Sequence, residues 1–157
     1  KLPKEKRYKY MMTYITTQLE IESDVYANIS NASAILFAIL ENINWSGFYF
    51  MRGGELVLGP FQGLPACNRI KVGKGVCGTS VEKREVQRIS NVHEFEGHIA
   101  CDSASNSEIV IPIIKNDKVY GVLDIDSFEY DNFSELEEEY LVKFVEKLNE
   151  KIDWELL

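Results

Sequence analysis

"SEIVIPIIKNDKVYGVLDID" occupies residues 107–126 and contains two β-forming runs on either side of the turn residues "KND". Runs rich in Val and Ile that are bounded by Asn, Asp or Ser are typical of paired strands. We therefore expect a hairpin here, and an antiparallel sheet at the centre of the fold.

Acidic residues lie at the ends of these two predicted strands. Glu108 opens the first strand, whereas Asp124 and Asp126 end the second at alternate positions, and so share one face of the sheet. If the strands pair through the turn, the three carboxylates meet at one end. Their repulsion would raise at least one pKa, so that this group could donate a proton near neutral pH, and the cluster could bind an ammonium group. A solvated strand face is the alternative for the two aspartates.

An earlier pair of strands is predicted from "WSGFYFMR" at 45–52 and "ELVLGPF" at 55–61, because "GG" between them is a tight hairpin signal. Trp45 and Tyr49 open the first of these strands. They could form the wall of a pocket for a small apolar group, although core packing is the commoner use of such residues.

Helices are predicted at both ends of the chain. Apolar residues recur every three or four positions over 3–19 and 24–40, with Asp24 as a plausible cap. The run "SELEEEYLVKFVEKLNEKI" predicts a last helix with Ser134 as cap and Glu137 completing a capping box. We expect an α+β fold in which the N- and C-terminal helices pack on one face of the antiparallel sheet.

The composition fits one domain over 1–157, with helices in 1–41, sheet and active-site loops in 43–127 and a helix in 134–157. The net charge of -8 disfavours nucleic acid and anionic membranes as partners.

"AILFAIL" at 34–40 is far shorter than the ~20 residues that span a bilayer, and no secretory signal is apparent. Three cysteines, an odd number, fit a reducing compartment, so we expect a cytoplasmic protein.

The three cysteines, Cys67, Cys77 and Cys101, lie in the loop-rich middle of the chain or at its edges, where one short helix at 77–83 and a short strand near "VQRI" are expected. They could be small buried residues. They could also join His98 in a Cys₃His zinc site, but close CxxC-type pairs are missing, and we expect no metal.

A redox role uses the same thiols differently: one thiolate attacks an electrophile and a second thiol forms a disulfide. Cys77 lies at a predicted helix start, where the helix dipole favours a thiolate. Cys101 follows His98 and precedes Glu108, so local sequence leaves open which thiol attacks. His93 and His98 are expected to make hydrogen bonds in loops rather than to catalyse.

Five segments together resemble the GAF-domain family of free methionine-R-sulfoxide reductases. They are "INWSGFYF", "LVLGPFQGLPACNRI", "VGKGVCGTSV", "GHIACDSASNSEIVIP" and "GVLDIDS", all within residues 43–127. The flanking helices match this family in layout only. The resemblance implies a single GAF-like domain that reduces free L-methionine (R)-S-oxide.

The resemblance also implies roles for the cysteines. Cys101 would be the nucleophile that becomes a sulfenic acid, and Cys67 the resolving thiol that forms a disulfide with it. Cys77 would be a secondary or backup thiol. Thioredoxin would be the external reductant, no cofactor would be bound, and the protein would form a homodimer through its terminal helices.

The remaining site residues follow the family motifs. Glu108 and Asp126 would be catalytic acids, and together with Asp124 they would hold the substrate ammonium. Trp45 and Tyr49 would pack on the substrate methyl group. The alternative is a non-catalytic GAF module that senses a small ligand, because most GAF domains are sensors. Those sensors differ from this chain in lacking the three cysteines, which the reductase needs.

Overall fold

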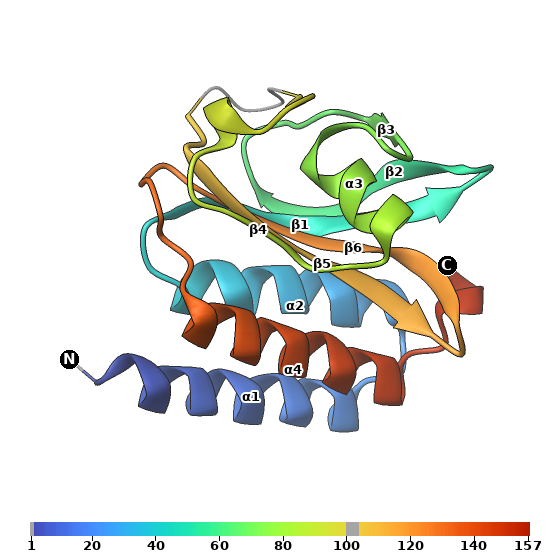
Figure 1. Cartoon of the computed structure of the whole chain (residues 1–157). Coiled ribbons are helices and arrows are strands. Elements are labelled where there is room, and N and C mark those ends of the chain that lie inside the picture. The colour runs from blue at the N-terminus through green and yellow to red at the C-terminus, as the bar shows by residue number, and fades with distance from the viewer. Residues whose placement is uncertain (1, 100–103) are drawn as a thin grey trace.

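The structure is a computed structural model and describes residues 2–99 and 104–157. Within these residues the elements run in the order α1 Lys4–Ile21, α2 Val25–Ile39, β1 Ile43–Arg52, β2 Glu55–Gly63, β3 Arg69–Lys71, α3 Gly75–Lys83, β4 Gln87–Ile89, β5 Ser107–Lys115, β6 Lys118–Ser127 and α4 Glu135–Lys151. Short 3-10 turns occur at Val92–Glu94 and Trp154–Leu156. Figure 1 shows the sheet between a layer of helices and a smaller layer that contains α3.

The six strands form one antiparallel sheet in the order β3-β2-β1-β6-β5-β4. The predicted hairpin between β5 and β6 is confirmed, and Asn116 and Asp117 at its turn both have positive φ, as a tight two-residue turn requires. The predicted β1–β2 hairpin turns at Gly53 and Gly54, which also have positive φ. The two central hairpins therefore form where local turn chemistry predicts them.

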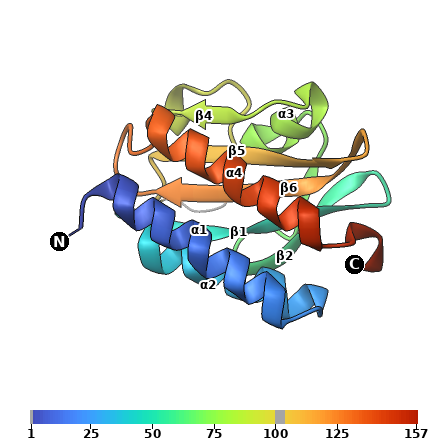
Figure 2. The same ribbon diagram turned by 90° about the horizontal axis from the view of Figure 1, so that it is seen from below.

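Helices α1, α2 and α4 lie on one side of the sheet (Figures 1 and 2). Helix α2 packs on β1 and β2, α4 packs on β5, and α1 packs across α2 and α4. Alternate strand residues point into this layer, so Phe48, Phe50 and Leu123 join the large apolar core. The predicted α+β fold with terminal helices on one face is confirmed. None of the described helices is long and apolar enough to span a membrane.

The predicted helix caps are present. The Asp24 side chain accepts a hydrogen bond from the backbone N–H of Ala27 at 2.8 Å. At the start of α4, Ser134 and Glu137 form the expected capping box. These caps satisfy N–H groups that have no partner inside the helix, which explains why both helices start where the sequence predicts.

A second, smaller core lies on the opposite face of the sheet, under α3. Its buried residues are Trp45, Tyr49, Leu56, Ile70, Val76, Cys77, Val81, Val110 and Val122. Helix α3 starts at Gly75, two residues before the predicted start, and strand β3 was not predicted. This face of the sheet carries the candidate site.

Candidate active site

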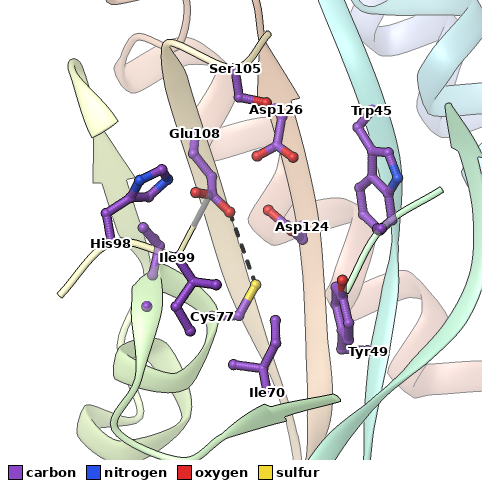
Figure 3. A pocket seen from close by; sticks show the side chains of 13 residues that line it. Trp45, Tyr49, Ile70, Cys77, His98, Ile99, Ser105, Glu108, Asp124 and Asp126 are labelled. Carbon is purple, nitrogen blue, oxygen red and sulfur yellow. Dashed lines mark hydrogen bonds between the residues drawn. The ribbon is translucent and has the colours of Figure 1, made fainter. Parts of the chain in front are cut away.

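A pocket of about 500 Å³, including its open mouth, lies on the sheet face that carries α3. Strands β1, β5 and β6 form its floor, and α3 and two loop segments form its sides (Figure 3). Its lining combines acidic, aromatic, thiol and apolar side chains: Trp45, Tyr49, Ala66, Ile70, Gly75, Val76, Cys77, His98, Ile99, Ser105, Glu108, Asp124 and Asp126. The pocket therefore offers both charged and apolar contacts to a small molecule.

The three acidic residues predicted from the hairpin meet in this pocket. In the β5–β6 register Glu108 pairs with Asp126, and Val110 pairs with Asp124. Because Glu108, Asp124 and Asp126 all line the pocket, the carboxylates converge as predicted. Glu108 and Asp124 are only 8% and 5% exposed, so Asp124 does not lie on the solvated strand face of the alternative interpretation, whereas Asp126 is half-buried.

Burial and mutual repulsion shift the acidity of this cluster. Burial raises the pKa of Glu108 well above its ordinary value, and the charges of Asp124 and Asp126 raise it further. Burial also raises the pKa of Asp124. The cluster therefore holds protons at pH values where exposed carboxyl groups are ionised. Within the described residues, Oδ1 of Asp124 is buried and accepts no hydrogen bond, which leaves an acceptor for a ligand.

Cys77 lies beside these carboxylates, with Sγ 4.0 Å from Oε2 of Glu108 (Figure 3). Burial raises the pKa of the Cys77 thiol well above its ordinary value, and the charges of Asp124 and Glu108 act in the same direction. The predicted thiolate at the start of α3 is therefore wrong: burial next to acidic groups outweighs the dipole of a short helix. Cys77 packs as a small apolar residue in the minor core.

Ligand atoms of Cys77, Glu108 and Asp124 lie within 4.8 Å of one another, close enough to surround a metal ion. A cation bound there would lower the pKa of each ligand, so the raised pKa values do not decide against a metal. With no cation present, the same environment favours the protonated forms of these groups, which can then share and donate protons. The Cys₃His set considered from the sequence includes Cys101, which lies outside the described residues.

Trp45 and Tyr49 form the aromatic wall of the pocket and also belong to the minor core. Their rings stack with centroids 5.9 Å apart, and Trp45 also stacks on Phe61 at 5.2 Å. The indole N–H of Trp45 donates to the carbonyl of Leu64 at 3.1 Å, and the Tyr49 hydroxyl donates to the carbonyl of Cys67 at 3.0 Å. Trp45 and Tyr49 therefore both line the pocket and pack in the minor core, so both interpretations of these residues from the sequence apply.

The other two cysteines, Cys67 and Cys101, lie in the loop-rich middle of the chain. Cys67 is half-buried in the segment between β2 and β3 and is disulfide-bonded in this structure, and its neighbour Ala66 lines the pocket. Cys101 lies outside the described residues, so its role stays a prediction from the sequence.

Several pocket residues were not predicted as site residues, among them His98, Ile99 and Ser105. Burial lowers the pKa of His98, and the neighbouring His93 adds to this effect, so His98 is neutral near pH 7. His93 pairs with Asn106 through Nε2, which agrees with its predicted hydrogen-bonding role. His98 reaches the pocket because of the course of the loop that carries it, and no local sequence pattern predicts that course.

Residues 25–152 match the sequence model of the GAF domain family. The chain belongs to the GAF domain family. The match covers α2, all six strands, α3 and α4, so both the central sheet and the pocket are part of this GAF domain.

Among similar proteins, the free methionine-R-sulfoxide reductase of Escherichia coli is 52% identical over 127 residues, covering 81% of this chain and 77% of the relative. A structure of fRMsr of Staphylococcus aureus in its reduced form has a TM-score of 0.90 and 46% identity, covering 93% and 95% of the two chains. The free methionine-R-sulfoxide reductase of Neisseria meningitidis, solved in complex with its substrate, has a TM-score of 0.90 and 36% identity over 94% and 89% of the chains. The resemblance of this GAF domain to oxidoreductases of this name is confirmed.

Proposed function

We propose that this GAF domain reduces free L-methionine (R)-S-oxide to L-methionine. The observation that carries the proposal is a pocket in which three carboxyl groups face an aromatic wall, in a chain 52% identical to a free methionine-R-sulfoxide reductase. The carboxyl groups and the aromatic wall match the two ends of this substrate, an ammonium group and a methyl sulfoxide.

Recognition of the free amino acid follows from the acidic cluster. Glu108, Asp124 and Asp126 would bind the substrate ammonium, and Oδ1 of Asp124 is an acceptor without a partner in the described residues. A methionine sulfoxide inside a peptide has no ammonium group, so these buried acids would remain unsatisfied. Trp45 and Tyr49 would pack on the methyl group, which selects for a small apolar substituent on sulfur.

In the proposed first step, the Cys101 sulfur attacks the sulfoxide sulfur while a protonated carboxyl group gives its proton to the sulfoxide oxygen. Glu108 is the preferred donor because its pKa is raised, and Asp126 is its partner in the register. The oxygen moves to Cys101 as a sulfenic acid, methionine is released, and the Cys101 thiol proton replaces the one donated. Cys101 loses two electrons and the sulfoxide gains two.

Recycling would use a second thiol. The Cys67 sulfur attacks the sulfur of the Cys101 sulfenic acid, an S–S bond forms, and the S–O bond breaks with loss of water. The dithiol of thioredoxin would then reduce this disulfide. Cys77 would serve at most as a secondary thiol, because its buried, protonated form is a poor nucleophile.

Two further expectations belong to this proposal. A cycle driven by thioredoxin needs a reducing compartment, which agrees with a cytoplasmic location. A homodimer through the terminal helices is also proposed, and α1 exposes Tyr10, Tyr14 and Ile21, which could contribute to such a contact.

The decisive experiment measures reductant consumption by a thioredoxin system with free methionine-R-sulfoxide as substrate. The S epimer and a peptide-bound sulfoxide serve as controls, and Cys101→Ser serves as the inactive variant. Turnover of the free R epimer alone, lost in Cys101→Ser, supports the proposal. No turnover by folded, fully reduced protein would overturn it in favour of a GAF module that senses a small ligand.

A further inference from the structure

The segment that carries Cys67 has no regular secondary structure. It connects β2, which ends at Gly63, to β3, which begins at Arg69. Leu64 and Pro65 are exposed, and Cys67 is half-buried. No sheet ladder covers residues 64–67. Cys67 is disulfide-bonded in this structure, so the side-chain hydrogen bonds to the carbonyl groups of this segment, together with the disulfide, set where Cys67 lies in the disulfide state.

Both of these side-chain donors come from the aromatic wall of the pocket. Trp45 donates to the carbonyl of Leu64 and Tyr49 donates to the carbonyl of Cys67, at opposite ends of the segment. The donors lie four positions apart on β1 and face the same side of the sheet. The wall that would contact the substrate methyl group therefore also anchors the Cys67 segment.

The Tyr49 hydroxyl is well suited to this task. Tyr49 is almost fully buried, and burial, followed by the nearby charge of Asp124, raises the pKa of its hydroxyl far above the ordinary value. The hydroxyl therefore keeps its proton and remains a donor to the Cys67 carbonyl over the whole working pH range.

The neighbouring Trp45 ring is packed too tightly to move freely. Gly63 has a φ of +134°, and a Cβ added there would lie 2.7 Å from Cδ1 of Trp45. On the other side, a Cβ at Gly47 would lie 2.8 Å from the far edge of the same ring. Glycine at both positions lets the indole fit between the strands, and Tyr49 stacks against it.

We propose that Tyr49 is a positioning residue for Cys67: its hydroxyl holds the Cys67 backbone so that the thiol can reach the sulfenic acid formed in the first step. The inference rests on the proposed function and deepens it. The step that Tyr49 assists is the formation of the S–S bond with loss of water, in which the rate depends on the approach of two sulfur atoms.

Tyr49→Phe tests this inference because it keeps the ring and removes only the hydrogen bond. Two rate constants are measured without reductant after mixing reduced protein with free methionine-R-sulfoxide. The rate of methionine formation reports the first step. Sulfenic acid is trapped with dimedone at successive times and quantified by mass spectrometry, and the rate of its disappearance reports disulfide formation. The ratio of the second constant to the first should fall about fivefold, as expected for one net hydrogen bond.

Tyr8→Phe is the matched control, since it removes a buried tyrosine hydroxyl that donates to Glu137 on the helical side of the sheet. This control should lower the thermal unfolding midpoint without changing the ratio. If Tyr49→Phe does not fold, Trp45→Phe removes the donor to Leu64 and should lower the same ratio.

Two results separate this inference from the function on which it rests. If wild-type protein forms no methionine, the proposed function fails. If the wild type is active but Tyr49→Phe leaves the ratio unchanged, or lowers both steps by the same factor, Tyr49 acts only through the pocket wall and the inference is wrong.

Discussion

Glu108 shows how a side chain acquires its chemistry from residues that are distant along the chain. It pairs with Asp126 across the β5–β6 hairpin and lies close to Asp124 and Cys77. Burial is the largest cause of its raised pKa, followed by the charges of the two aspartates. An ordinary glutamate would be ionised near pH 7, whereas this one can donate a proton.

Glu108→Gln should slow the first step while keeping the size of the side chain. The amide cannot supply the proton to the sulfoxide oxygen and removes one partner of the ammonium group. We expect methionine formation in a single turnover to fall at least about a hundredfold, the lower range for loss of a general acid. Glu20→Gln, at an exposed position of α1, is the control. A change of less than twofold in Glu108→Gln would remove the acid role.

The same substitution should change how stability depends on pH. Because the pKa of Glu108 is higher in the folded protein than in the unfolded chain, its contribution is full below the unfolded pKa and is lost as pH rises toward the folded pKa. Wild-type urea midpoints should therefore fall as pH rises above the ordinary pKa of a glutamate, and Glu108→Gln should show a smaller fall. Parallel curves for the two proteins would contradict this prediction.

The pocket could be predicted in part from single residues. Strand alternation and the hairpin register bring Glu108, Asp124 and Asp126 together, and both depend on local sequence. The protonation of Cys77 could not be predicted in this way, because its causes include Glu108, 31 positions away. The presence of His98 in the lining likewise depends on the course of a loop across the sheet face.

At the scale of elements, α4 is joined to α1 through its first turn. Glu137 accepts hydrogen bonds from the Ser134 backbone at 2.7 Å and from the Tyr8 hydroxyl at 2.8 Å, and Lys4 lies 3.5 Å from it. Burial opposes the charge on Glu137, but the bonds from Ser134 and Tyr8 outweigh burial and lower its pKa. The capping box thus also anchors one helix on another.

Ser134→Ala should destabilise the protein without affecting the site. Loss of an N-cap hydroxyl lowers the free energy of unfolding by about 1 kcal/mol. Urea unfolding measures the loss, and Ser23→Ala is the control because Asp24 caps α2. First-step rates per folded molecule should match the wild type, and an unchanged midpoint would show that Glu137 caps the helix without Ser134.

Element boundaries followed the sequence wherever the signals were local. Helices α2 and α4 have side-chain caps, and the two central hairpins have turn residues with positive φ. Helix α3 starts after Lys74, which makes no side-chain cap hydrogen bond, so its start lacks a sequence signal. Strand β3 has three residues and forms by pairing with β2, which no short pattern predicts.

At the scale of the whole molecule, the sheet separates two cores of unequal size. The larger core lies under α1, α2 and α4, and the smaller core lies under α3 together with the pocket. Helix α3 packs on strands β3, β4, β5 and β6, and it makes at most a few residue contacts with the other helices. We therefore expect α3 to open more easily than the helical layer.

Alkylation of Cys77 measures this opening. In the Cys67→Ser/Cys101→Ser protein Cys77 is the only thiol, and it is buried and protonated. Iodoacetamide should label it at least about a hundredfold more slowly in native protein than in urea-unfolded protein, as detected by mass spectrometry. Native labelling within tenfold of the unfolded rate would show that α3 does not protect this thiol.

The alternation of side chains along β5 and β6 has a practical consequence for protein engineering. Ile109, Ile111 and Ile125 point into the helical core, whereas the intervening Glu108, Val110 and Asp124 face the opposite side. A combinatorial library restricted to the second set would redesign ligand preference while leaving the interior of the helical layer intact. One face of this hairpin thus provides a binding surface that can be changed, while its other face remains buried in the helical core.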